Sequence, residues 1–188
     1  MPVTLPLFPL GTVLFPGVLL PLHIFEERYR QLVRDLQAGP QPGRFAVIAI
    51  RKGRETGDTG VSALYDVGCT ATVRRVAGRG DGRYDLVTVG TQRFRLGELD
   101  RSRLYLQGQV EMLPEHIGGA AAARQAAQAV REAFRGYREA LARRRLADAG
   151  GPGLPDEPVA LSYAVAASMV LSLPDRQSLL AEPDAASR

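Results

Sequence analysis

Short apolar runs separated by glycine-rich and proline-rich stretches fill the first 115 residues, which is typical of β-strands joined by turns. Many of these runs are β-branched or alternate with polar residues, as a half-buried strand requires. The predicted strands are Leu5–Leu10, Val18–Leu22, Phe45–Arg51, Val61–Val67, Thr70–Val76, Tyr84–Val89, Arg93–Leu96 and Tyr105–Leu113. Residues 78–83 lie between two of these runs, and their three glycines predict a hairpin loop because glycine adopts the positive φ of tight turns.

One helical pattern interrupts the predicted strands. Its apolar residues fall at positions 25, 29, 32, 33 and 36, which share one helical face, and Gly39-Pro40 ends it. After about residue 117 the pattern is helical throughout. The sequence therefore predicts a strand-rich subdomain over residues 1–116 and an α-helical subdomain over residues 117–188.

The helical part begins with a long alanine-rich helix whose apolar stripe consists of Val130, Phe134, Tyr137 and Leu141. A neighbouring stripe holds five arginines, at positions 124, 131, 135, 138 and 145. We interpret this stripe as a solvated flank whose arginine stems cover the edge of the core. Residues 150–155 predict a loop, and further helices are predicted over Val159–Leu171 and from Pro174 to Leu180.

Composition excludes several classes of protein. Hydrophobic residues make up 45% and charged residues 23% of the 188, as in a globular chain, so collagen-like, coiled-coil and wholly disordered proteins are disfavoured. The net charge of +4 is too small to indicate a nucleic-acid-binding protein by itself. A single cysteine excludes an internal disulfide and favours a reducing compartment. We find no signal peptide and no stretch that spans a bilayer, so we expect a cytoplasmic protein.

The sequence offers little chemistry for catalysis, metal binding or cofactor binding. His23 and His116 are the only histidines, and Cys69 lies in an alternating strand pattern that indicates a buried core thiol. Two distant histidines without a chelating motif predict no metal site. The glycines of residues 78–83 precede a strand and not a helix, so they predict no phosphate loop, and Lys52 follows no Walker A pattern. We therefore expect a protein that is not an enzyme and binds no cofactor.

Four motifs resemble the Lon protease N-terminal (substrate-binding) domain family. They are residues 5–17 (LPLFPLGTVLFPG), residues 21–29 (PLHIFEERY), residues 81–87 (DGRYDLV) with Gly90, Arg93 and Phe94 behind them, and Ser162-Tyr163 with residues 171–180 (LSLPDRQSLL). The resemblance covers nearly the whole chain. The sequence around residues 24–29 is more similar to stand-alone bacterial members and to cereblon-like relatives than to the protease, whose ATPase and protease modules have no counterpart here.

The resemblance implies an α+β fold with a PUA-like β-barrel subdomain and a C-terminal α-helical bundle. It also implies a non-catalytic domain that binds exposed or unfolded polypeptide, alone or as an adaptor, as a monomer or weak dimer. The alternative is RNA binding, which the PUA-like resemblance and two arginine-rich segments favour; these are residues 71–103, with a net charge of +4, and 124–145, with +5. An aromatic content of 6% without tryptophan argues against base stacking. A small-molecule pocket of the cereblon type requires a zinc-bearing domain that has no counterpart in the sequence.

Candidate binding residues within these motifs are Glu26, Arg28, Tyr29 and Arg93. Glu26, Arg28 and Arg93 form an internal ion pair that locks the first helix to the barrel, or they line a ligand groove. The phenylalanines Phe8, Phe15 and Phe25 are predicted to fill the barrel. The prolines at positions 6, 9, 16 and 21 are predicted at strand ends and bends, because proline lacks a backbone donor. Residues 182–188 are similar to a helix start that the chain does not complete, which predicts a trimmed or frayed terminus.

Overall fold

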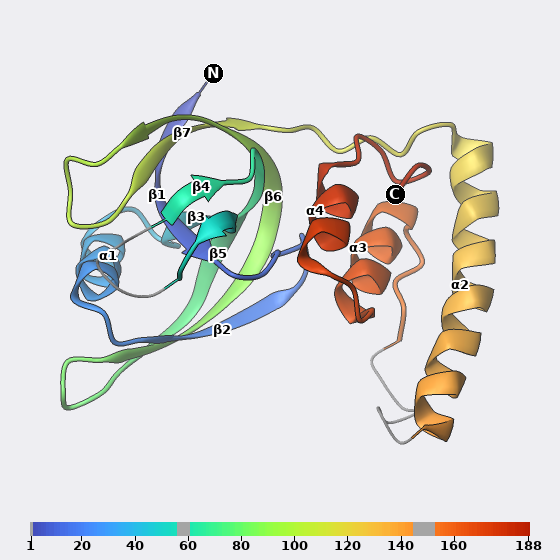
Figure 1. Cartoon of the computed structure of the whole chain (residues 1–188), viewed down its shortest axis with the longest axis horizontal. Coiled ribbons are helices and arrows are strands. Elements are labelled where there is room, and N and C mark those ends of the chain that lie inside the picture. Colours follow the sequence, from blue (N-terminus) through green and yellow to red (C-terminus); the bar gives the residue numbers. More distant parts are fainter. Residues whose placement is uncertain (1, 56–60, 145–152) are drawn as a thin grey trace. The chain divides into compact units, whose positions relative to one another are not determined.

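A computed structural model describes residues 2–55, 61–144 and 153–188 (Figure 1). Strands come first along the chain and most of the helices follow, so the structure confirms the α+β class. The elements are β1 (Val3–Leu10), β2 (Leu19–Ile24), α1 (Glu27–Ala38), β3 (Arg44–Gly53), β4 (Val61–Leu64), β5 (Val67–Gly78), β6 (Tyr84–Asp100), β7 (Gln107–Met112), α2 (Ala120–Arg143), α3 (Pro158–Ser168) and α4 (Leu173–Ala181).

The strands form one mainly antiparallel sheet in the order β1-β7-β6-β5-β3-β4. Two pairings lie off this path. Strand β2 pairs antiparallel with β6, and β1 pairs parallel with β3 through Leu7 opposite Ala46. Following the pairings from β1 through β7, β6, β5 and β3 therefore leads back to β1.

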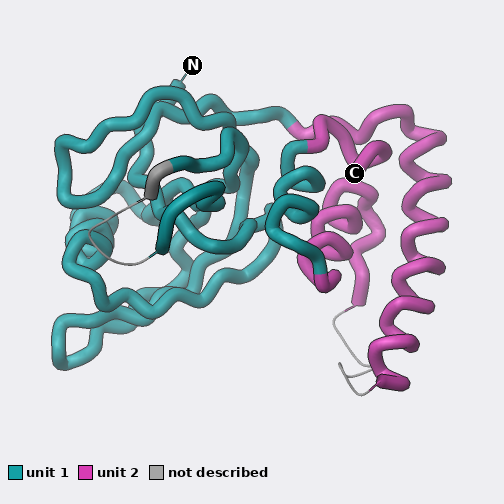
Figure 2. The backbone as a smooth tube through the Cα atoms, in the orientation of Figure 1, with its two compact units in different colours: residues 1–114, 171–181 teal, residues 115–170, 182–188 magenta. Residues whose placement is uncertain are grey.

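The molecule divides into two compact units, which Figure 2 shows in different colours. Unit 1 comprises residues 1–114 and 171–181, and unit 2 comprises residues 115–170 and 182–188. The sheet, α1 and α4 belong to unit 1, whereas α2 and α3 belong to unit 2. The division into domains at residue 117 stays a prediction.

The apolar core of unit 1 confirms two of the three phenylalanines predicted there. Phe8 and Phe15 are buried, and Phe8 stacks on Tyr29 with a distance of 4.1 Å between ring centroids. The prediction for Phe25 is wrong, because 53% of this residue is exposed. Strand alternation explains the difference. Ile24 ends β2 with its side chain buried, so the next residue points outward, and α1 begins only at Glu27, too late to place Phe25 on the helix face.

The predicted strands Tyr84–Val89 and Arg93–Leu96 are one continuous strand, β6. Gly90 lies where the two were expected to separate, and the chain there is not a turn. A Cβ atom at this position would lie 2.2 Å from the carbonyl oxygen of Phe15, so glycine permits a close approach of two backbone segments. The hairpin before β6 is confirmed: Gly82 has a φ of 80°, and the amide of Arg79 donates to the carbonyl of Arg83.

The prolines only partly follow the prediction. Pro16 lies in a turn, but Pro6 and Pro9 lie within β1 and Pro21 lies within β2. Strand β1 pairs with β7 up to Pro6 and with β3 from Leu7 onward. A residue without an amide donor is tolerated at this change of partner, and it is equally tolerated in a strand such as β2 that pairs along one side.

Unit 2 has its own small core. Phe134 of α2 is buried with Leu161 and Val165 of α3, and Val130 and Tyr137 pack against them, which confirms three of the four residues of the predicted apolar stripe. Glu157 caps α3, since its carboxylate accepts hydrogen bonds from the amides of the second and third following residues, and Pro158 occupies the first helical position. The part of the predicted loop over residues 150–152 lies outside the described residues.

The last seven residues do not form the predicted helix start. Asp184 makes an isolated β-bridge to His116, and the amide of Ala185 donates to the carbonyl of His116 at 3.0 Å. The side chain of Arg188 is buried, with its guanidinium 3.9 Å above the ring of Tyr163. Contacts within unit 2 therefore order this segment, although its local sequence favours a helix.

Candidate functional site

Three of the four predicted binding residues meet at the start of α1. The Arg28 guanidinium lies 2.8 Å from the Glu26 carboxylate, donates to the carbonyl of Glu55 at 3.0 Å and covers the ring of Tyr29 at 4.6 Å. Tyr29 is buried, and burial raises the pKa of its hydroxyl to about 12, so it is protonated at neutral pH. These contacts hold α1 and the segment at Glu55 together.

Arg93 lies elsewhere in unit 1. Its guanidinium is buried and donates to the carbonyls of Leu180, at 3.1 Å, and Pro114, at 3.3 Å. Leu180 belongs to α4, and Figure 1 shows α1 and α4 on opposite sides of the sheet. The predicted ion pair therefore joins Glu26 to Arg28 only, because Arg93 fixes α4 and does not reach α1. A binding role for the four residues stays a prediction.

Exposed apolar side chains gather instead on the outer face of β2 and the adjoining part of β6. We call these side chains together with the polar His23 the β2 surface; its members are Leu19, Pro21, His23, Phe25 and Val87. Pro21 lies opposite Val87 in the antiparallel register, so both side chains point to the same face. Leu19 is 63% exposed and Phe25 is 53% exposed. Large apolar side chains gathered in this way indicate a surface that contacts another molecule.

A polar cluster closes one end of the β2 surface. His23 Nδ1 donates to Asp85 Oδ1 at 2.7 Å, and Arg79 Nε donates to Asp85 Oδ2 at 2.7 Å. These hydrogen bonds, that of His23 first, hold the pKa of the Asp85 carboxyl below its usual range. The ring of Phe25 stacks on that of His23 with centroids 6.2 Å apart. The cluster therefore fixes the orientation of His23 and supports Phe25 at the surface.

Strand β2 also has an open side. Within the part of the chain that the structure describes, β2 pairs with β6 alone, and Figure 1 shows it at the margin of the sheet. Backbone groups alternate in direction along a strand, so every second carbonyl of β2 points away from β6, as does every second amide except at Pro21, which has none. Such an edge can accept a further strand.

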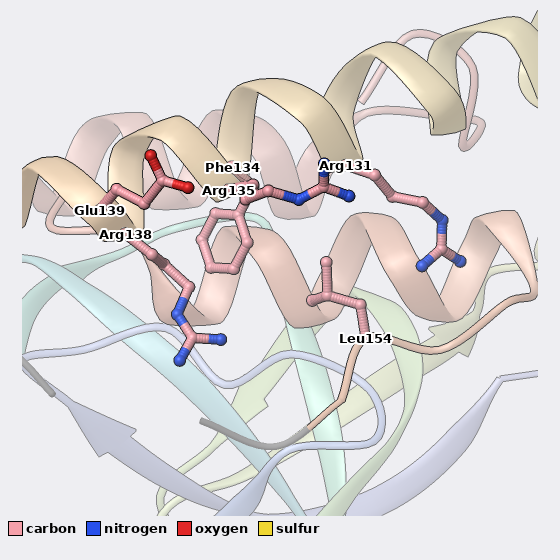
Figure 3. A pocket seen from close by; sticks show the side chains of 6 residues that line it. All are labelled: Arg131, Phe134, Arg135, Arg138, Glu139 and Leu154. Atoms are coloured by element: carbon pink, nitrogen blue, oxygen red, sulfur yellow. The ribbon is translucent and has the colours of Figure 1, made fainter. Parts of the chain in front are cut away.

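A second feature lies in unit 2, on α2. It is a groove of about 500 Å³, which we call the α2 groove; its lining residues are Arg131, Phe134, Arg135, Arg138, Glu139 and Leu154. Figure 3 shows the guanidinium groups of the three arginines around the Phe134 ring and the side chain of Leu154. The arginine stripe predicted as a solvated flank thus forms the wall of a hollow with an apolar floor.

Neither feature provides groups for metal or redox chemistry. Among the residues described, no cluster of three or more histidine, cysteine, aspartate or glutamate side chains could hold a metal ion. Cys69 is buried, as its strand pattern indicated. None of the described helices combines the length and the apolar character that crossing a membrane requires. The arrangement is suited to binding through apolar contact and charge.

Sequence reasoning missed the β2 surface, although the signal was present. Leu19, Pro21 and His23 are spaced two apart, which places them on one face of a strand. Which face is exposed depends on the strands that cover the other one. Val87 could be added only when the register of β2 against β6 was known, and Phe25 only when α1 was seen to begin at Glu27.

The whole chain matches a known family. The family described as the ATP-dependent protease La (LON) substrate-binding domain matches residues 4–188. Lon protease 2 of Syntrophobacter fumaroxidans is 29% identical over 98% of this chain and 23% of its own length. Lon protease of Anaeromyxobacter dehalogenans is 33% identical over 61% of this chain and 13% of its own. The chain thus spans less than a quarter of the length of these curated relatives.

Solved structures agree in fold. The chain is similar to a Lon N-terminal domain protein from Xanthomonas campestris, with 25% identity and a TM-score of 0.65 over 97% of this chain and 92% of that one. It is also similar in fold to the N-terminal domain of a Mycobacterium avium complex Lon protease, with 20% identity and a TM-score of 0.63 over 95% and 90%.

Proposed function

The chain belongs to the family of LON substrate-binding domains, and we propose that it binds exposed apolar segments of unfolded or extended polypeptides. It acts as a non-catalytic recognition domain, either alone or as an adaptor for a larger machine. The observation that carries the proposal is the β2 surface, where exposed apolar side chains lie beside a strand edge.

The two properties of the β2 surface act together on an extended ligand. The backbone of the ligand pairs with the open side of β2, which supplies affinity independent of sequence. Every second side chain of the ligand then lies beside Leu19 and Pro21, with Val87 one strand further away, which removes apolar area from water at roughly 25 cal/mol per Å². Most folded proteins pair or cover their strand edges and expose few contiguous apolar residues, so the surface favours unfolded segments.

The strand pairings also support β2 as the element that binds the ligand. The pairings from β1 through β7, β6, β5 and β3 return to β1, which is the connectivity of a closed barrel. We identify this ring as the PUA-like barrel expected from the sequence. Strand β2 lies outside the ring, attached to β6 only among the described strands, and it is therefore the element that can accept a ligand strand without opening the barrel.

Paired serine substitutions test the β2 surface. The double variant Leu19→Ser/Val87→Ser should lose most of the affinity for an uncharged, unstructured apolar peptide, measured by fluorescence anisotropy. Leu104→Ser is the matched control, because Leu104 is 69% exposed in the same unit but does not belong to the β2 surface. Unchanged peptide binding by the double variant, with both proteins folded by circular dichroism, would exclude the β2 surface as the binding site.

The absence of catalysis is tested separately. We expect the purified chain to hydrolyse neither ATP nor unfolded casein, because its motifs belong to the substrate-binding domain family and Cys69 is buried. Reproducible casein cleavage by a homogeneous sample, lost in Cys69→Ala, would contradict a purely binding role.

A further inference from the structure

We propose that the α2 groove is a second polypeptide-binding surface, and that it takes extended segments in which carboxylates flank an apolar side chain. The inference rests on the proposed function for the class of ligand, since both surfaces take polypeptide. The inference goes beyond the proposed function because it assigns a separate site in unit 2, which distinguishes acidic from uncharged peptides.

The floor of the groove is apolar and preformed. Phe134 is held in the core of unit 2 with Leu161 and Val165, and Leu154 packs against the same cluster. The volume of about 500 Å³ lies within the range of about 300–1,000 Å³ that small-molecule pockets occupy. One large apolar side chain with its backbone fits such a space.

The wall of the groove is cationic. Three arginines line it against one acidic residue, Glu139, whose carboxylate points away from the Arg138 guanidinium in Figure 3. Arg131 donates to the carbonyl of Pro155 and to Asp156 Oδ1, so its position is fixed by the protein. Arg135 is exposed and makes no hydrogen bond or ion pair with any residue in the described ranges. A guanidinium in this state is available to a ligand carboxylate, which it can bind with two parallel hydrogen bonds.

The spacing of the arginines suits an extended acidic segment. Positions 131, 135 and 138 lie along one face of α2 and extend over about 10 Å of the helix axis. In an extended chain, side chains two residues apart lie on the same side and about 7 Å from each other. An apolar side chain on the floor, against the partly exposed Leu154, therefore places acidic side chains two residues before and after it within reach of the arginine wall.

The aromatic residue of the groove does not suit a nucleic acid. Single-stranded RNA is held by stacking bases on exposed aromatic faces. Phe134 is only 6% exposed, and its ring packs against Tyr137 with centroids 5.9 Å apart. The groove can therefore bind a peptide carboxylate through opposite charge, but it offers no open aromatic face on which a base could stack.

Two peptides and two variants test the inference. The peptides are unstructured and differ only in having glutamate or glutamine two residues before and after a central leucine. At low salt the glutamate peptide should bind about five- to tenfold more tightly than the glutamine peptide. The double variant Arg135→Gln/Arg138→Gln should abolish this preference. Arg124→Gln/Arg144→Gln is the matched control, since it removes the same charge from exposed positions of the same helix region outside the groove and should retain the preference.

Each outcome decides one of the two proposals. Equal binding of both peptides by the parent protein, with the uncharged peptide still sensitive to Leu19→Ser/Val87→Ser, would overturn the α2 groove and leave the proposed function intact. A glutamate preference lost equally in both arginine variants would show a long-range charge effect and also overturn it. A preference for the glutamate peptide that is lost only in the groove variant supports the α2 groove, even if the β2 variant binds both peptides as the parent protein does. The parent protein could instead bind single-stranded RNA and show no preference between the two peptides. If only the groove variant then lost RNA binding, the groove would be a nucleic-acid site and the proposal would be overturned.

Discussion

Arg93 Nη1 donates a hydrogen bond to the backbone carbonyl of Leu180 at 3.1 Å, although 87 residues separate them in the chain. The carbonyl lies in the last turn of α4, where helical carbonyls have no partner within the helix. A guanidinium at this end satisfies the carbonyl and opposes the negative end of the helix dipole. Arg93 is 1% exposed and attaches α4 to β6, and a binding role for it stays a prediction.

Replacing Arg93 should therefore destabilise unit 1. We expect Arg93→Met to lower the free energy of unfolding by about 2–4 kcal/mol, because it leaves the carbonyls of Leu180 and Pro114 without this donor in a buried place. Arg95→Met, an exposed position on the same strand, should change it by less than about 0.5 kcal/mol. Urea denaturation measures the free energy of unfolding of both variants. Equal losses in the two variants would show that Arg93 does not attach α4 to β6.

The two phenylalanines Phe15 and Phe25 should respond oppositely to truncation. Phe15→Ala removes a fully buried ring and should cost about 3–5 kcal/mol of stability. Phe25→Ala removes an exposed ring, so stability should change by less than about 1 kcal/mol, while binding of the uncharged apolar peptide weakens. Thermal melts and anisotropy separate the two effects. A large loss of stability in Phe25→Ala would show that its ring contributes to the core.

Adding one methyl group should change the stability in opposite directions at two glycines. Gly90→Ala places a Cβ atom 2.2 Å from the Phe15 carbonyl oxygen, so the backbone must shift and the protein should be severely destabilised. At Gly136, inside α2, a Cβ atom meets nothing within 4 Å. Gly136→Ala should therefore raise stability by about 0.5–1 kcal/mol through helix propensity. Melting temperatures that fall in both variants would contradict the open space at Gly136.

The hydrogen bond from the Tyr105 hydroxyl to Asp35, at 2.6 Å, predicts a dependence of stability on pH. This bond is the main cause that lowers the pKa of the Asp35 carboxyl. A lowered pKa in the folded state stabilises the protein above the unfolded value of about 4, and the contribution is lost as the pH falls through the lower folded value. Tyr105→Phe should thus cost about 1–2 kcal/mol at neutral pH, with a smaller difference in acid.

Denaturation of Tyr105→Phe and the parent protein over a pH series checks this sign. Tyr65→Phe is the control, because the Tyr65 hydroxyl makes no hydrogen bond to the residues described. A cost for Tyr105→Phe that stays constant down to about pH 2 would show that the ionised carboxylate of Asp35 is not the acceptor.

Local pattern was sufficient for several elements. The hairpin at residues 78–83, helix α1 and the apolar stripe of α2 could be predicted because each depends on residues close together in sequence: glycines at a turn, or apolar residues at helical spacing. The family was also predictable, since the combined spacing of several proline, glycine and aromatic motifs is specific.

The misassigned residues depend on distant partners. Phe25 shares the apolar character of Phe15, and only the start of α1 and the burial of Ile24 turn it outward. Residues 182–188 have a helix-start sequence, yet contact with His116 and Tyr163 determines their conformation. The position of Arg93 away from the other three candidate residues could not be predicted for the same reason, because its charge was visible but its carbonyl partners were not.

The sequence by itself determined the type and order of most elements, since backbone preference and hydrophobic periodicity are properties of neighbouring residues. Tertiary structure alone decided which apolar residues remain exposed and which arginines are available. The register of β2 against β6 brings Pro21 beside Val87, and the packing of α2 on α3 places three arginines around Phe134. Burial is set by which surfaces meet, and pairings between residues tens of positions apart leave no local trace in the chain.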